Sequence, residues 1–337
     1  MALPISVLDL SPVSSGSTSP EALRNTIDLA RLADRLGYTR FWLAEHHNMP
    51  GVASSAPEIL IGHVASATTR IRVGSGGIML PNHTPLKVVE TFRVLEALHP
   101  DRIDLGIGRA PGTDQVTALA LRRSPKALGA GDFPAQLAEV LAFSRNQFPD
   151  GHLFQTVTAV PNDVSLPPIW LLGSSDYSAL MAAEQGMGFA FAHHISPEYA
   201  VPAMRAYREH FKPSSHLPAP RTILTVSVVC AGTDAEAEEL GSSMDLAFLR
   251  LRSGRPGLLP SPAEARAYPY TAAERAQIQA YQSHRTVGSS ETVERRLRAL
   301  IDHTRADELM VMTMIHRHQD RLRSYELLAE RFGLTRS

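Results

Sequence analysis

The sequence alternates short apolar segments with longer segments of helical periodicity. The apolar segments predict strands at 5–8, 39–44, 71–74, 102–107, 168–172, 188–192, 222–229 and 308–312. The periodic segments predict helices that begin near residues 19, 57, 85, 134, 175, 198, 234 and 317. Eight such units favour a closed parallel barrel, because an open doubly wound sheet seldom needs eight units without a GxGxxG loop after its first strand. We therefore expect the α/β class and a (β/α)8 TIM barrel.

The chain of 337 residues is longer than such a barrel requires. A typical (β/α)8 barrel needs about 250 residues, so the excess is expected in insertions. Two segments contain the proline and glycine that mark loops: 110–133 follows the fourth predicted strand, and 254–288 follows the seventh. We expect a single domain over residues 1–337. Segment 254–288 is expected to pass over the barrel and segment 110–133 to lie near the pocket mouth, and either could act as a lid.

Charge and cysteine content exclude several classes of partner. The chain has 33 basic and 34 acidic residues, a net charge of -1, which provides no field to attract nucleic acid or an anionic membrane. Cys230 is the only cysteine, so no disulfide can form within the chain. Residues 1–10 have neither a basic start nor an apolar stretch long enough for a signal peptide. We predict a cytoplasmic protein.

Polar and glycine-rich motifs follow three successive predicted strands. Glu45-His46-His47 ends the strand at 39–44, Gly74-Ser75-Gly76-Gly77 ends the next, and Gly106-Ile107-Gly108-Arg109 ends the fourth. The carboxyl ends of parallel strands are where ligand sites are built. The spacing therefore predicts one composite pocket and favours an enzyme.

A zinc site is the first alternative to test, because His46, His47, His193 and His194 all follow strands. Neighbouring residues on a strand point to opposite faces, so an adjacent His-His pair does not easily share one ion. We therefore predict no metal in this pocket.

Four motifs resemble those of bacterial luciferase-like flavin monooxygenases. They are Trp42-Leu43-Ala44-Glu45-His46-His47, Val73-Gly74-Ser75-Gly76-Gly77-Ile78-Met79-Leu80-Pro81, Arg102-Ile103-Asp104-Leu105-Gly106-Ile107-Gly108-Arg109 and Leu171-Leu172-Gly173-Ser174-Ser175. The resemblance covers nearly the whole chain. It is greatest to the subgroup of single-chain, alkanal-monooxygenase-like proteins.

The resemblance implies roles for particular residues. His46 matches the histidine that supports the peroxyflavin, and an imidazole that titrates near pH ~6.5 suits proton exchange. Gly76-Gly77 lies where the family has a non-proline cis peptide against the flavin ring. Arg109 matches the arginine that meets the FMN phosphate, and Gly173-Ser174-Ser175 would present a helix N-terminus to the same phosphate. His194 would reach the flavin or the substrate.

The implied activity is that of a two-component monooxygenase. A separate flavin reductase would supply reduced FMN, which reacts with oxygen to give a C4a-peroxyflavin that oxygenates a small organic substrate. An aldehyde, an alkane, a sulfonate and a polyketide all remain possible substrates. Two other functions stay open on the same fold: hydride transfer with a deazaflavin coenzyme, and flavin binding without turnover.

The family also implies a homodimer. Its interface would use the helices after the second and third strands, where Ile59, Leu60, Val64 and Ala65 form an apolar stripe. The same stripe would serve equally well for packing against the barrel.

Overall fold

A computed structural model describes residues 3–123, 132–214 and 217–334 of the chain. Its strands are β1 Ile5–Asp9, β2 Arg40–Leu43, β3 Arg72–Ser75, β4 Ile78–Met79, β5 Ile103–Gly108, β6 Ile169–Gly173, β7 Gly188–Ala192, β8 Thr222–Ala231, β9 Arg285–Ser289 and β10 Glu308–Met312. Its helices are α1 Ser19–Leu36, α2 Pro57–Ala67, α3 Pro85–Leu98, α4 Gln115–Arg122, α5 Phe133–Arg145, α6 Asp176–Glu184, α7 Ala200–His210, α8 Asp234–Arg252, α9 Pro262–Ala267, α10 Ala272–Gln282, α11 Ser290–Thr304 and α12 His318–Phe332. The described residues also include the short 3-10 helices η1 Leu80–Asn82 and η4 Pro197–Tyr199. Within the described residues, no helix is long and apolar enough to cross a membrane.

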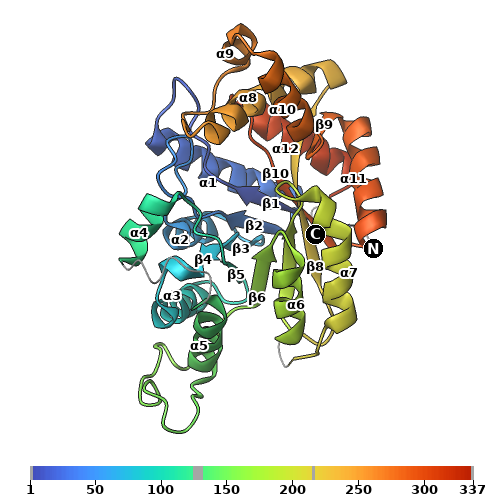
Figure 1. Cartoon of the computed structure of the whole chain (residues 1–337). Helices are drawn as coiled ribbons and strands as arrows, with labels where there is room; N and C mark the ends of the chain where they lie inside the picture. Colours follow the sequence, from blue (N-terminus) through green and yellow to red (C-terminus); the bar gives the residue numbers. More distant parts are fainter. Residues whose placement is uncertain (1–2, 124–131, 215–216, 335–337) are drawn as a thin grey trace.

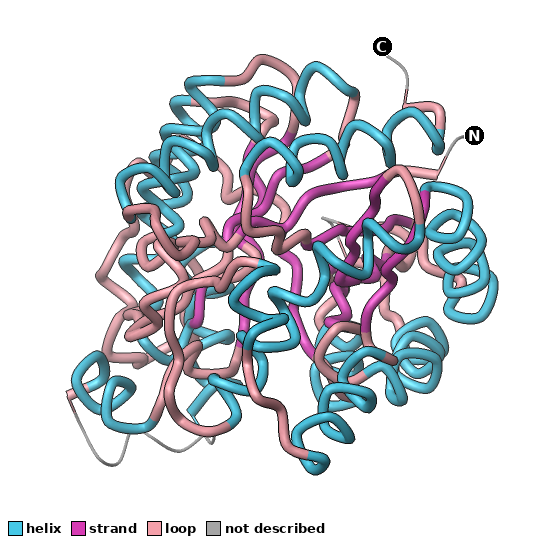
Figure 2. Tube along the Cα trace, turned by 90° about the horizontal axis from the view of Figure 1, so that it is seen from above, coloured by secondary structure: helices cyan, strands magenta, loops and turns pink. Residues whose placement is uncertain are grey.

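The strands form a closed parallel barrel, which confirms the predicted fold (Figure 1). The order is β1, β2, β3, β5, β6, β7, β8 and β10, and β10 closes the ring by pairing with both β8 and β1. The short β4 lies beyond the end of β3 and also pairs with β5. Seen from above, the helices surround the strands (Figure 2).

Residues alternate between the two faces of each barrel strand. In β2, Phe41 and Leu43 belong to the apolar layer beneath the outer helices, whereas Trp42 belongs to a second cluster that includes Met310 and Met312 of β10. This period of two assigns every second residue to the barrel interior. The interior side chains therefore form layers from the amino-terminal end of the strands to the carboxyl end.

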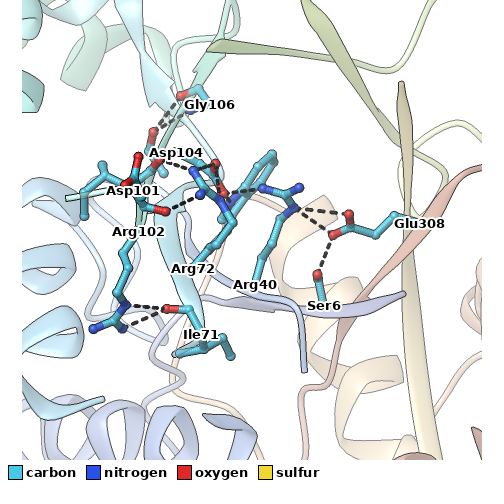
Figure 3. A network of polar contacts seen from close by, with 12 residues as sticks. Ser6, Arg40, Ile71, Arg72, Asp101, Arg102, Asp104, Gly106 and Glu308 are labelled. Atoms are coloured by element: carbon cyan, nitrogen blue, oxygen red, sulfur yellow. Dashed lines mark hydrogen bonds and ion pairs between the residues drawn. The ribbon is translucent and has the colours of Figure 1, made fainter. Parts of the chain in front are cut away.

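The amino-terminal end of the barrel is closed by buried charges, a group we call the floor network (Figure 3). Arg40 Nη1 lies 2.7 Å from Asp104 Oδ2, and Arg40 Nε lies 3.0 Å from Glu308 Oε1. Arg72 Nη2 lies 2.7 Å from Asp104 Oδ1, and Ser6 donates to Glu308. Burial disfavours the Asp104 charge, but the two arginines hold its pKa below the usual value. Two cations and two anions compensate one another in this network, so each of the four charges has a partner within it.

The two predicted insertions have more regular structure than the sequence indicated. Segment 254–288 contains α9 and α10, and its last residues lie in β9, which pairs with the second half of β8. The predicted segment therefore ends inside β9, which begins at Arg285. The sequence does not indicate this strand because Arg285-Thr286-Val287-Gly288 lacks an apolar pattern. Arg285 is buried by its ion pair with Asp245, its hydrogen bond to the Gly241 carbonyl oxygen and its contact with the Tyr281 ring.

The insertion after β5 includes helix α4. Asp114 caps this helix by accepting hydrogen bonds from the amides of Val116 and Thr117. The predicted segment 110–133 ends in the first residue of α5, and its residues 124–131 lie outside the described residues.

Candidate active site

A cavity of about 220 Å³ opens at the carboxyl ends of the barrel strands. It brings together nearly all the residues singled out in the sequence: His46, Gly76, Arg109, Gly173, Ser174, Ser175 and His194. They come from the loops after β2, β3, β5, β6 and β7. Of the predicted set, only Gly77 does not line this cavity. It faces β5 instead, where a Cβ on it would lie 2.8 Å from the Gly106 carbonyl oxygen.

The wall after β3 is bare backbone. The Gly76–Gly77 peptide bond is cis, as the family resemblance implied. A Cβ on Gly76 would come within 2.6 Å of Leu8 Cδ1, so no other residue fits there without displacing the barrel interior. This part of the cavity therefore offers a surface without side chains, against which a planar ring system could lie.

His46 is a neutral imidazole held by the backbone. Its Nδ1 lies 3.2 Å from the Gly112 carbonyl oxygen. Because a carbonyl only accepts, Nδ1 carries the proton, and Nε2 of the neutral ring is left as an acceptor. Burial lowers the pKa of His46, against the opposing effects of Gly112 and Glu45.

His194 has the same arrangement on the opposite side of the barrel mouth. Its Nδ1 lies 3.2 Å from the Thr225 carbonyl oxygen, and burial lowers its pKa to about 4. The neighbouring His193 and His46 also lower the pKa of His194. The cavity therefore contains two neutral imidazoles, each able to accept a hydrogen bond or a proton at Nε2.

Arg109 and the start of α6 form the polar end of the cavity. The Arg109 guanidinium stacks over the Tyr177 ring at 4.2 Å and makes no ion pair with any residue that the structure describes. Helix α6 begins after Ser175 without a side-chain cap, so its first amides are available to a ligand. An unpaired cation beside a helix N-terminus is suited to an anion such as a phosphate. Asp176 also lies in this first turn, but it is exposed and does not line the cavity.

The histidines that follow the strands do not converge on a common point. Over the described parts of the chain, no group of three or more His, Cys, Asp or Glu side chains is placed to hold a metal ion. His46 and His194 each use Nδ1 on a backbone carbonyl, and His47 turns to Glu45 at 2.9 Å.

The chain is similar to known proteins over nearly its whole length. The family model described as luciferase-like monooxygenase matches residues 3–307. The chain belongs to the luciferase-like monooxygenase family. It is 44% identical to an Escherichia coli K12 protein named luciferase-like monooxygenase, over 96% of this chain and 95% of that one. It is 36% identical to the N-acetyl-S-alkylcysteine monooxygenase of Bacillus subtilis 168, over 97% of each chain.

Solved structures agree with this membership. The crystal structure of apo-MsnO8 has a TM-score of 0.90 and 44% identity, and the match covers 99% of this chain and 100% of that chain. Two more distant structures share the luciferase-like fold. One is the oxygenating constituent of 3,6-diketocamphane monooxygenase from Pseudomonas putida in complex with FMN, with TM-score 0.72, 18% identity and 98% and 97% coverage. The other is an F420-dependent secondary alcohol dehydrogenase, with TM-score 0.70, 13% identity and full coverage of both chains.

Glu45 organises this luciferase-like site from behind the cavity wall. Its fully buried carboxylate accepts hydrogen bonds from the Met79 amide at 2.8 Å and Asn82 Nδ2 at 3.2 Å, and from His47 and His83, each at 2.9 Å. Burial opposes its charge, but the hydrogen bonds from His83, His47 and the Met79 amide lower the pKa of Glu45. Burial likewise opposes the positive charge of His83, but Glu45 raises the pKa of that imidazole. The Glu45 carboxylate thereby links the loop that contains His46 to residues 79–83, which follow the cis peptide bond.

Sequence reasoning assigned no role to Glu45, although Glu45 lies inside a motif used to recognise the family. A buried acid beside two histidines is the signal that could have found it. The four donors come from sequence positions up to 38 residues away, and nothing local indicates that they converge.

A second cavity of about 650 Å³ adjoins the first and shares Leu10, His46, His194, Ile195 and Met312 with it. Its roof comes from α8, α10 and the intervening segment, which lie together in Figure 1. Apolar side chains predominate, among them Met49, Met244, Phe248, Leu251, Leu259, Tyr281 and Met314. The insertion after β8 thus covers the mouth of the barrel. Nothing in the sequence indicates that Met244 and Phe248 of α8 face a cavity, because their spacing is that of any helix packed on a barrel.

Proposed function

We propose that this luciferase-like monooxygenase uses reduced FMN, supplied by a separate flavin reductase, and molecular oxygen to oxygenate a small organic substrate. One observation carries the proposal: a single cavity combines a side-chain-free wall at Gly76, an unpaired Arg109 beside a helix N-terminus, and two neutral imidazoles. These features match the ring, the phosphate and the reacting end of a flavin mononucleotide.

Each residue has a defined task in this proposal. Arg109 and the first amides of α6 hold the phosphate, and the backbone at Gly76-Gly77 supports the flavin ring. His46 and His194 accept hydrogen bonds or protons at Nε2. When bound, reduced FMN supplies the electrons that activate oxygen. The apolar roof keeps water from the reacting atoms.

The substrate enters through the second cavity in this proposal, since that cavity meets the first at His46 and His194. The B. subtilis relative is named for an N-acetyl-S-alkylcysteine, which joins an apolar chain to a polar head. The second cavity, with its apolar body and polar rim, is compatible with compounds of this kind. We place the reaction in the cytoplasm, where the single buried Cys230 stays reduced.

The decisive experiment is an anaerobic titration with reduced FMN and, separately, with a reduced deazaflavin coenzyme, followed by rapid mixing with oxygen. Tight FMN binding and a transient with the absorbance of a C4a-peroxyflavin are expected. Preference for the deazaflavin would overturn the proposal in favour of hydride transfer. FMN binding without a transient, with and without candidate substrates, would favour the non-catalytic alternative.

We also propose a homodimer formed through α2 and α3. Of the predicted stripe, Leu60, Val64 and Ala65 are buried against the barrel, and only Ile59 is exposed, at 61%. Val94 and Leu98 of α3 are exposed as well, at 47% and 67%. Light scattering coupled to gel filtration should give twice the mass of the chain for the wild type and the monomer mass for Ile59→Asp. A wild-type monomer would contradict the proposal.

A further inference from the structure

The second cavity has a polar rim opposite its apolar body. Three side chains able to donate hydrogen bonds reach it from different parts of the chain: Arg252 ends α8, Gln277 lies in α10, and His284 precedes β9. Arg252 and Gln277 are exposed, whereas His46 and His194 lie where this cavity meets the first one. The cavity thus runs from an open polar end to the proposed reaction centre.

None of the three rim side chains has a partner that would explain its polarity. Among the described residues, Arg252, Gln277 and His284 make no side-chain hydrogen bond to a cavity neighbour, and Arg252 makes no ion pair. None of the described residues that line either cavity is Asp or Glu. Unpaired donors in a cavity whose lining has no carboxylate favour an anion and disfavour an ammonium group. The carboxylate of Asp245, close to Tyr281, is paired with Arg285.

We propose that Arg252, assisted by Gln277 and His284, binds the carboxylate of an amphipathic organic acid, and that this class of compound is the substrate. The inference rests on the proposed function, because it names the substrate of the same site. A planar guanidinium fork matches a carboxylate in two parallel hydrogen bonds.

The apolar body of such an acid has a matching environment. It lies against the stacked rings of Phe248 and Tyr281, whose centroids are 4.0 Å apart, and beside the flexible side chains of Met244 and Met314. Its far end reaches His46 and His194. The carboxylate at the rim then fixes which atom of the chain is presented for oxygenation, as a remote anchor does in other enzymes.

The test measures binding without turnover. The full-length protein is loaded with oxidised FMN and titrated calorimetrically with decanoate, methyl decanoate and decylammonium, with no reductase present. Decanoate should bind most tightly and decylammonium most weakly. In Arg252→Gln, the dissociation constant for decanoate should rise about tenfold, because a charged contact at an exposed side chain is lost and solvent screens part of its effect, while that for methyl decanoate stays unchanged.

Arg255→Gln is the matched control, because Arg255 is exposed on the same segment but does not line the cavity. Equal weakening in the two variants, or equal affinity of the wild type for acid and ester, would overturn the proposal. Arg252→Lys keeps the charge and should retain part of the preference for decanoate. A thermal melt of each variant verifies folding.

The outcomes separate this inference from the proposed function. FMN binding without preference for decanoate removes the anion site and leaves the monooxygenase proposal intact. Preference for decanoate in a protein that does not bind FMN leaves the rim site and removes the proposed cofactor.

Discussion

The two ends of the barrel use the same kinds of side chain in opposite ways. At the amino-terminal end, Arg40 and Arg72 are paired with Asp104 and Glu308 in the floor network. At the carboxyl end, Arg109 has no ion-pair partner among the described residues. A paired buried charge holds strands in register, whereas an unpaired one is available to a ligand. The comparison indicates that partners, and not residue type, distinguish structural from functional charges in this fold.

The largest expected effect comes from breaking the floor network. Asp104→Asn removes the charge that both Arg40 and Arg72 share, and the free energy of unfolding should fall by about 3 kcal/mol. The half-buried Arg72 then has no anionic partner among the described residues, and the buried Arg40 keeps only Glu308. Urea denaturation measures the change. In the control Arg266→Ala, which breaks the exposed pair with Glu239, the loss should stay below about 1 kcal/mol. Similar losses in both variants would show that the floor pairs add no more than a surface pair.

At the opposite end, Arg109→Ala should affect binding and not stability. Loss of a charge-assisted contact to phosphate weakens FMN binding by about 2 kcal/mol, or roughly thirtyfold. Riboflavin lacks the phosphate, so its affinity should hardly change, and fluorescence titration compares the two ligands. Arg205→Ala, an exposed arginine on α7, is the control. Equal weakening for FMN and riboflavin would place the phosphate elsewhere.

Glu45 lies between these extremes, since it is paired and buried but supports the functional end. Glu45→Gln should cost about 1–3 kcal/mol, as expected for a buried hydrogen-bonded group that loses its charge. The depressed pKa of Glu45 contributes stability above its ordinary value of 4.5, which is lost as the pH falls through the folded value. The raised pKa of His83 contributes stability below its ordinary value of 6.5, which is lost as the pH rises through the folded value.

The stability gap between wild type and Glu45→Gln should therefore be widest between about pH 4.5 and 6.5 and narrower at either side. Urea midpoints at pH 5.5 and pH 9 test this. A gap that does not change with pH would show that the carboxylate contributes only neutral hydrogen bonds.

The smallest expected effect belongs to His46, whose neutral ring offers one acceptor. His46→Ala should leave FMN affinity largely intact and shorten the lifetime of the oxygenated flavin about fivefold, which corresponds to about 1 kcal/mol for one neutral hydrogen bond. Stopped-flow absorbance measures the lifetime. His63→Ala, an exposed histidine on α2, is the control. An unchanged lifetime would remove His46 from the proposed chemistry.

Much of the site could be predicted because its residues directly follow strands. His46, Arg109 and Ser174 lie at the ends of β2, β5 and β6, and in a parallel barrel these ends share one face. Residues that line the site from helices could not be found in this way. Phe248 of α8 and Tyr281 of α10 become neighbours only because the insertion after β8 folds back over the barrel mouth.

The sequence by itself determined the barrel and the end at which its site lies. Strand and helix periodicities are local, and right-handed connections leave one way for eight such units to close. Only the tertiary structure decided which charged groups pair. The partners of Glu45 and of Arg40 are brought together from distant segments, and β9 exists because β8 offers it a partner. Pairing depends on the distance between side chains in the folded chain, and no spacing along the sequence specifies that distance.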